Sequence, residues 1–288
     1  MLPIAPLFDP APHAPMERAP AGGVDCHLHV FGPLSSYPLD DERSYTPGEA
    51  SLEDYAVLQR RLGLERMVIV QPSVYGTDNQ CTYDALVQMG DSARAIAVLP
   101  PDVDEEELAH LHRAGFRGVR FNLITGGGHP LEAVDELVPK IAPLGWHVQF
   151  FMGDQVLLDR HAWLAALPVP LVFDHFGPLQ PAPAGPEQPA MHALLNLLER
   201  GNSWVKISGA YRIDHGVAPW PGAKPLALRL LEEFPERLVW GTDWPHPMPP
   251  GAMPNDGDLL DALWDWCQDD ALYERVLVEN PARLYGFT

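Results

Sequence analysis

Short apolar runs alternate with longer amphipathic stretches along most of the chain. Continuous apolar runs of this length, separated by helical stretches, are typical of buried strands in a parallel sheet that helices cover. The pattern predicts eight strands, over residues 23–31, 66–73, 94–100, 117–123, 146–151, 171–177, 204–210 and 237–245.

Helix signals lie between these runs. Residues 51–63 begin with a Ser–x–x–Asp capping pattern and end at a glycine, and residues 104–115 are acidic at their start and basic near their final glycine. Further helices are expected over residues 130–145, 188–201 and 224–236. Eight strand–helix units in 288 residues favour an α/β fold of one (β/α)8 barrel over an open doubly wound sheet.

The barrel is expected to occupy residues 23–288, after a Pro-rich N-terminal extension over residues 1–22 whose prolines deny it a helix. The glycines at 126–128 follow a predicted strand without the spacing of a dinucleotide fingerprint, and we interpret them as a flexible loop. The sequence carries no Walker motif either.

Charge and cysteine content exclude some classes of partner and indicate the redox compartment of the protein. A formal net charge of −20 argues against nucleic acid and against an anionic membrane surface as partners. The three cysteines are widely spaced and indicate a reducing compartment rather than a disulfide framework. We found no apolar run of membrane-spanning length and no signal-peptide pattern, so we expect a cytoplasmic protein, with an oligomer left open.

Polar side chains gather where the predicted strands end, which is where barrel enzymes carry their active sites. The first strand places His27 and His29 two residues apart, hence on one face. These imidazoles could be metal ligands, oxyanion donors or buried structural groups. The other strand-end residues are Gln71, Ser73, Tyr75, Arg120, Asn122, Asp174, His175, Lys206, Ser208, Tyr211, Arg212, Asp243 and His246.

An ordered set of motifs from Gly22 to Phe287 resembles the amidohydrolase superfamily. The set consists of "HLHVFGP", "GVRFN", "FDHFG", "KISGAYR", "GTDWPHP" and "NPARLYGF". It is most similar to the branch that contains 2-pyrone-4,6-dicarboxylate lactonase and sugar-lactone hydrolases and isomerases. The resemblance implies a (β/α)8 barrel that hydrolyses an ester-like bond.

The resemblance also implies roles for individual residues. Asp243 takes the place of the general base that activates water, and His27, His29 and His175 surround the scissile carbonyl. The residues expected to bind substrate are Arg120, Arg212, Ser73, Tyr75 and Asn122. Lys206 is expected to form an ion pair inside the barrel.

Many members of the superfamily hold a divalent metal with histidines on strands 1, 5 and 6 and an aspartate on strand 8. Here His147 begins the fifth strand, about 13 Å along it below Phe151, which is too deep to join Asp243. We therefore favour no cofactor. The alternative is zinc or another divalent ion on His27, His29, His175 and Asp243.

The favoured reading is a metal-independent lactonase in which the three histidines donate hydrogen bonds to the carbonyl oxygen. Related lactonases carry another basic residue after the "GVRFN" motif and a tyrosine at the end of strand 5, but this chain has "ITGGG" and "FFMG". We thus expect a small carboxylated lactone as substrate, either 2-pyrone-4,6-dicarboxylate-like or a sugar-acid lactone, with mono-acid and sugar-acid lactones turned over better than the dicarboxylate itself. The alternatives are a divalent-metal amidohydrolase or decarboxylase, and a catalytically silent ligand-binding barrel.

Overall fold

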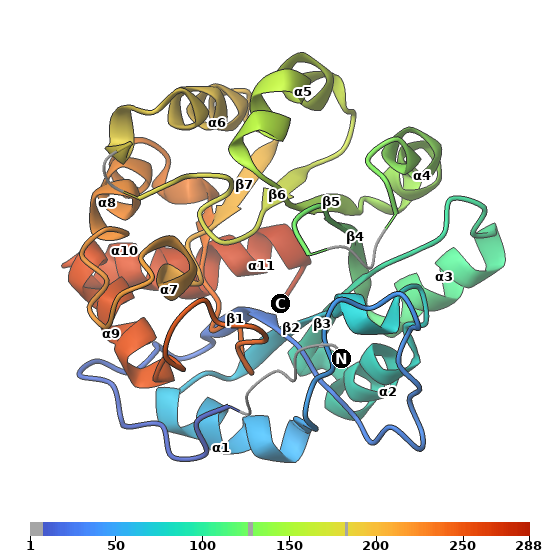
Figure 1. Cartoon of the computed structure of the whole chain (residues 1–288), viewed down its shortest axis with the longest axis horizontal. Helices are drawn as coiled ribbons and strands as arrows, with labels where there is room; N and C mark the ends of the chain where they lie inside the picture. Colours follow the sequence, from blue (N-terminus) through green and yellow to red (C-terminus); the bar gives the residue numbers. More distant parts are fainter. Residues whose placement is uncertain (1–7, 126–128, 182–183) are drawn as a thin grey trace.

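The computed structural model describes residues 8–125, 129–181 and 184–288. Its eight parallel strands follow one another around a barrel in sequence order, which confirms the predicted (β/α)8 architecture (Figure 1). The strands are β1 Val24–Leu28, β2 Arg66–Val70, β3 Ala93–Ala97, β4 Phe116–Asn122, β5 His147–Phe151, β6 Leu171–Phe173, β7 Ser203–Lys206 and β8 Leu238–Val239.

The last strand and the segment after it close the barrel against the first strand. The amide of Cys26 donates to the carbonyl of Trp240 (2.9 Å), and the amide of Asp243 donates to the carbonyl of His27 (2.8 Å). The amide of His29 donates in turn to the carbonyl of Trp244 (2.8 Å). This pairing brings the His–x–His motif directly beside the aspartate from the other end of the chain.

Helices on the outside of the barrel cover the strands (Figure 1). The predicted capping pattern forms at α1, where the Ser51 side chain accepts from the Asp54 amide and Gly63 ends the helix at φ 83°. The helices are α1 Leu52–Leu62, α2 Gln80–Met89, α3 Glu105–Ala114, α4 Ala133–Ile141, α5 Asp154–Ala166, α6 Pro189–Glu199, α7 Ala210–Ile213, α8 Lys224–Glu233, α9 Asp256–Cys267, α10 Asp270–Glu274 and α11 Asn280–Tyr285. None of these helices is both long and apolar enough to span a bilayer.

Apolar side chains fill the lower barrel and the layer between strands and helices. Val68, Ile96, Val172 and Val239 pack inside the barrel and are fully buried. The upper barrel is lined instead by buried polar side chains, and those side chains form the candidate site.

The described part of the N-terminal extension carries no helix or strand and packs on the barrel. The ring of Phe8 lies 4.9 Å from that of Trp244, and the Met16 amide donates to the Asp261 carboxylate (2.6 Å). The loop predicted at 126–128 lies outside the described residues.

Candidate functional site

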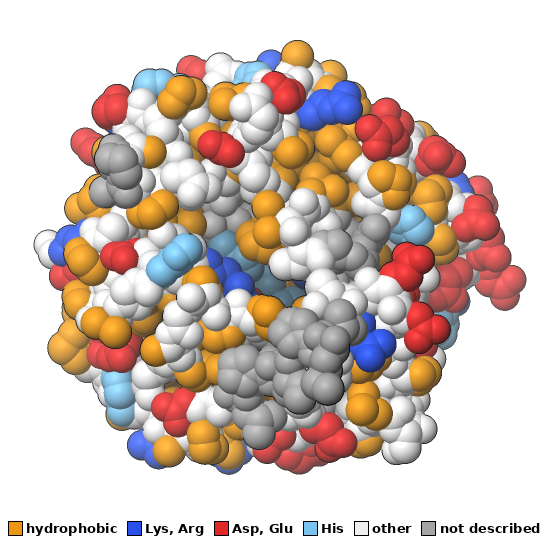
Figure 2. Space-filling model, in the orientation of Figure 1, with side chains coloured by type: hydrophobic (Ala, Val, Ile, Leu, Met, Phe, Trp, Pro, Cys, Tyr) orange, Lys and Arg blue, Asp and Glu red, His pale blue; other side chains and the backbone are white. Residues whose placement is uncertain are grey.

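A pocket of about 400 Å³ opens at the C-terminal ends of the strands, where Figure 2 shows basic and histidine side chains inside a central hollow. Its lining combines polar groups of the strand ends with apolar groups of the surrounding loops: His29, Ser44, Tyr45, Pro72, Ser73, Arg120, Asn122, Ile124, Thr125, Phe151, His175, Arg212, His215, Asp243, Pro247, Met248 and Pro250. A larger hollow of about 490 Å³ lies between α2 and α3, but its lining carries four carboxylates and no lysine or arginine.

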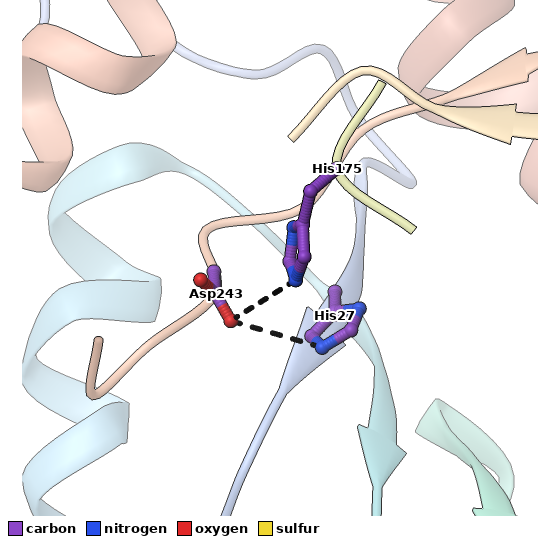
Figure 3. Close-up of side chains that lie close together, drawn as sticks. All are labelled: His27, His175 and Asp243. Carbon is purple, nitrogen blue, oxygen red and sulfur yellow. Dashed lines mark ion pairs between the residues drawn. The ribbon is translucent and has the colours of Figure 1, made fainter. Parts of the chain in front are cut away.

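Three imidazoles surround one oxygen of Asp243. The Nε2 atoms of His27, His29 and His175 lie 3.7, 3.8 and 3.7 Å from Asp243 Oδ1. Figure 3 shows His27 and His175 directed at this carboxylate from β1 and from the segment after β6. All four side chains are buried, and Asp243 Oδ1 has no hydrogen-bond partner among the described residues.

Backbone conformation aims two of these side chains. Asp243 and His175 have φ values of 65° and 53°, in the left-handed region that costs a non-glycine residue on the order of 1 kcal/mol. Gly209 gives His175 its room, because a Cβ at that glycine would lie 2.9 Å from His175 Nδ1. The turn after each strand thus holds its side chain over the barrel axis.

The neighbours of His27 and His29 favour opposite tautomers in the two rings. His29 Nδ1 lies 2.7 Å from the Val70 carbonyl, which only accepts, so Nδ1 carries the proton and Nε2 offers a lone pair to the site. His27 Nδ1 lies 3.3 Å from the Lys206 ammonium, which only donates, and 3.3 Å from Asp174 Oδ1, which only accepts. The Lys206 contact favours the His27 proton on Nε2, where it faces Asp243 Oδ1 at 3.7 Å.

The three imidazoles are neutral near pH 7. Burial, assisted by Arg120, lowers the pKa of His29 to about 3, and burial lowers the pKa of His175 to about 4. Burial also holds the pKa of His27 well below its usual value. The Ser208 hydroxyl, 3.0 Å from His175 Nδ1, can donate or accept, so His175 can present either tautomer to the pocket.

The second oxygen of Asp243 is occupied. Tyr211 OH and Arg212 Nε each donate to Asp243 Oδ2 at 2.5 Å. Burial alone would raise the pKa of Asp243, but the Arg212 guanidinium outweighs it and holds this pKa well below its usual range. Asp243 is therefore ionised, with only Oδ1 directed into the pocket.

A buried charged layer lies beneath the imidazoles. Asp174 Oδ2 accepts from Arg120 Nε (3.2 Å) and from Gln149 Nε2 (3.1 Å), and Lys206 donates to Gln149 Oε1 (2.9 Å). Lys206 Nζ also lies 3.5 Å from Asp174 Oδ1, so the predicted ion pair inside the barrel is confirmed. This layer fixes the ammonium that sets the tautomer of His27.

Comparison with known proteins agrees with this geometry. The family model described as amidohydrolase matches residues 24–287, which is most of the chain. The chain belongs to the amidohydrolase family.

Curated relatives of this amidohydrolase act on lactones. The chain is 39% identical to the 4-sulfomuconolactone hydrolase of Rhizobium radiobacter, over 95% of this chain and 93% of the relative. It is 36% identical to the 2-pyrone-4,6-dicarboxylate hydrolase of Comamonas testosteroni over the same shares. It is 32% identical to the D-galactarolactone isomerase of Agrobacterium fabrum, over 94% of each chain.

Solved structures show the same barrel. An Agrobacterium tumefaciens protein in its apo form superposes with a TM-score of 0.87 at 31% identity, covering 96% of this chain and 99% of its own. A probable 2-pyrone-4,6-dicarboxylic acid hydrolase from Acinetobacter baumannii, crystallised with citric acid bound, gives a TM-score of 0.81 at 28% identity, covering 92% and 100%.

The structure gathers most of the expected substrate-binding residues of this amidohydrolase in one pocket. Ser73, Arg120, Asn122 and Arg212 line it. Tyr75 is not part of the lining, and its hydroxyl accepts from the Gly32 amide (3.2 Å). Asn122 also organises its own loop, because its Oδ1 accepts from the amides of Ile124 and Thr125.

Sequence reasoning missed several lining residues, among them the polar Ser44, Tyr45, Thr125 and His215. Ser44 and Tyr45 reach the pocket from the loop after β1, far along the chain from the end of that strand, so no positional signal marked them. His147 lies deep in the barrel, buried, with its ring 5.6 Å from that of Tyr285, as its place at the start of β5 indicated.

The amidohydrolase fold raises the question of a divalent ion. Ligand atoms of His27, His175 and Asp243 lie within 4.8 Å of one another, close enough to share one. Imidazole ligands must offer a lone pair, however, and the Lys206 ammonium favours the His27 proton on Nε2. On β5, Gln149 follows His147 by two residues and is engaged with Lys206 and Asp174. A cation on His27 Nε2 would require the His27 proton on Nδ1, which lies 3.3 Å from both Lys206 Nζ and Asp174 Oδ1.

Proposed function

We propose that this amidohydrolase opens a small anionic lactone by water addition, with Asp243 as general base and without a metal. The observation that carries the proposal is the different surroundings of two rings beside Asp243 Oδ1. The Val70 carbonyl makes His29 Nε2 an acceptor, and the Lys206 ammonium favours His27 Nε2 as a donor. Ester hydrolysis needs both: an acceptor for the water and a donor for the carbonyl oxygen.

The mechanism follows from these assignments. Water donates its two protons toward Asp243 Oδ1 and His29 Nε2 and attacks the lactone carbonyl carbon, while Asp243 takes one proton. His27 Nε2–H, with His175 in the matching tautomer, donates to the carbonyl oxygen as negative charge grows on it. The ring C–O bond then breaks, and Asp243 returns its proton to the leaving oxygen, which leaves a hydroxy acid or its keto form.

The charges around the pocket support an anionic substrate. Arg120, Lys206 and Arg212 face two carboxylates, Asp174 and Asp243, so this region carries a positive excess in a protein of net charge −20. Arg120 uses only Nε in hydrogen bonds among the described residues. Its two terminal nitrogens are thus placed to hold a carboxylate at the pocket wall.

The activity test is a panel of lactones assayed with purified protein. It includes 2-pyrone-4,6-dicarboxylate, 4-sulfomuconolactone, galactarolactone and monocarboxylated lactones. We expect mono-acid or sugar-acid lactones to give a higher kcat/KM than the dicarboxylate, because the described pocket lining offers Arg120 and Arg212 as its only arginines. A clear preference for the dicarboxylate would overturn this substrate assignment.

Lactone isomerisation is the second candidate, because one relative is named as an isomerase. Labelled water separates the two reactions. Hydrolysis in H₂¹⁸O places one labelled oxygen in the product carboxylate, whereas transfer of the acyl group between hydroxyls of one substrate places none. A ring-closed, unlabelled product would show that the reaction is isomerisation and not hydrolysis.

Removal of metal should leave activity intact. Protein treated with a chelator and shown to be metal-free is expected to retain its kcat/KM, because the Lys206 ammonium favours a proton rather than a lone pair on His27 Nε2. The measurement is elemental analysis paired with turnover before and after adding Zn²⁺ or Mn²⁺. Activity that disappears on chelation and returns with the ion would establish the metal-dependent alternative.

The variant Arg120→Met should raise KM and lower kcat/KM at least about tenfold, since a charge-assisted hydrogen bond to a carboxylate contributes about 1.5–3 kcal/mol. The exposed Arg160, paired with Glu132 at 3.3 Å, supplies the matched control Arg160→Met, which should keep both constants. An unchanged KM in folded Arg120→Met protein would show that Arg120 binds Asp174 and does not bind the substrate.

A further inference from the structure

A buried chain of hydrogen bonds runs from Asp243 away from the pocket. Tyr211 OH lies 2.5 Å from Asp243 Oδ2 and 3.3 Å from His246 Nδ1, and His246 Nε2 lies 3.1 Å from Asp256 Oδ1. The four side chains come from α7, α9 and the segment after β8, and none is more than 3% exposed. The mechanism proposed above uses only the first of them.

The donors and acceptors of this chain can be assigned in order. Asp243 is ionised and accepts, so Tyr211 spends its single proton on Asp243. The Tyr211 oxygen can then only accept from His246, which requires a proton on His246 Nδ1. The remaining contact, between His246 Nε2 and Asp256 Oδ1, is held by a proton on one of these two atoms.

The contacts of His246 allow two arrangements. With its proton on Nε2, His246 donates to Asp256 and its bare Nδ1 competes with Asp243 for the Tyr211 proton. With a proton on Nδ1, His246 donates to the Tyr211 oxygen, and Tyr211 donates to Asp243. The buried Asp256 also has no other side-chain partner among the described residues, since its Oδ2 is unpaired.

We propose that Tyr211, directed by the His246–Asp256 pair, is a positioning residue that fixes the Asp243 carboxylate for catalysis. Tyr211 and Arg212 together saturate Oδ2, so rotation of the carboxylate would break two hydrogen bonds and Oδ1 stays among the imidazoles. The Tyr211 ring also lies 5.1 Å from the Arg212 guanidinium carbon and supports it. This role rests on Asp243 being the base, as the proposed function holds.

The first test is Tyr211→Phe, which removes one hydroxyl and keeps the ring against Arg212. A misplaced base should lower kcat by about tenfold to a hundredfold and leave KM within about threefold. The matched control is Tyr285→Phe, because the Tyr285 hydroxyl is equally buried but has no partner among the described residues. Equal kcat in the two variants, with wild-type turnover intact, would overturn the positioning role alone. Absence of any lactone turnover by wild-type protein would instead overturn the proposed function.

The second test measures which nitrogen of His246 is protonated and needs no substrate. In ¹⁵N-labelled protein, long-range ¹H–¹⁵N spectra of the histidine rings should show His246 protonated at Nδ1, with the signal assigned by its loss in His246→Asn. A His246 protonated only at Nε2 would overturn the proposed direction.

Variants of Asp256 test how its contact with His246 affects the direction of the hydrogen bond between His246 and Tyr211. Asp256→Asn can donate its amide proton to His246 Nε2, so it should keep Nδ1 protonated and retain kcat within about threefold. Asp256→Leu leaves His246 Nε2 without a partner, so the His246 proton should stay on Nδ1, facing the Tyr211 oxygen, and kcat should again stay within about threefold. A folded Leu variant whose kcat falls as in Tyr211→Phe while His246 stays protonated at Nδ1 would contradict the proposal.

Discussion

Replacing Asp243 with Asn should lower kcat by about 10²–10⁴-fold, the usual contribution of a general base. The amide keeps the size of the carboxylate and can still accept at one atom, but it cannot take a proton from water. Oδ1 is the atom that faces the three imidazoles at 3.7–3.8 Å, so the loss should fall on kcat more than on KM.

The matched control is Asp265→Asn, which removes a carboxylate that is 43% exposed and paired with Lys224 at 2.7 Å. Exposed pairs of this kind contribute about 0–1 kcal/mol to stability, so both turnover and Tm should stay near wild type. Near-normal kcat in a folded Asp243→Asn protein would end the case for this mechanism, whatever the substrate.

Replacing Lys206 with Met should lower kcat by about 10²–10³-fold, the size of a lost oxyanion donor. Without the ammonium, His27 Nδ1 is free to donate to Asp174 Oδ1, 3.3 Å away, and its Nε2 then faces the carbonyl oxygen as a lone pair. The prediction treats Lys206 as a residue that acts through His27 and never touches the substrate.

The same change should also destabilise the protein, by about 3–5 kcal/mol for breaking a buried ion pair, although Arg120 and Gln149 still bind Asp174. Turnover is therefore measured well below the Tm of the variant. Lys224→Met, at the exposed pair with Asp265, serves as the control. Wild-type kcat in folded Lys206→Met protein would show that the ammonium does not set the His27 tautomer.

The sequence predicted the barrel because the regular alternation of apolar strands and amphipathic helices is compatible with few other folds. It also predicted which side chains meet at the mouth, since residues at strand ends share one edge of a closed sheet. His27, His175 and Asp243 meet there as expected, from the first, sixth and eighth strand–helix units.

The chemistry of each imidazole could not be predicted, because it depends on contacts that no local pattern reports. The Val70 carbonyl that fixes His29 is 41 residues away in the chain, and the Lys206 ammonium that fixes His27 is 179 residues away. The same holds for Tyr75, whose hydroxyl faces the Gly32 amide although its strand-2 position favoured the pocket.

The closure of the barrel through β8 and β1 has a consequence for how activity appears during folding. The backbone of Asp243 pairs with that of His27, so the proposed general base and the proposed oxyanion donor lie on one seam that joins the two ends of the domain. Contacts of such long range form late, after the cost of closing the whole loop has been met. A folding intermediate in which seven strands have formed still has its histidines in place but lacks Asp243 beside them. Recovery of turnover after dilution from denaturant should therefore follow the pairing of β8 with β1, and the proposed activity would report the last step of folding.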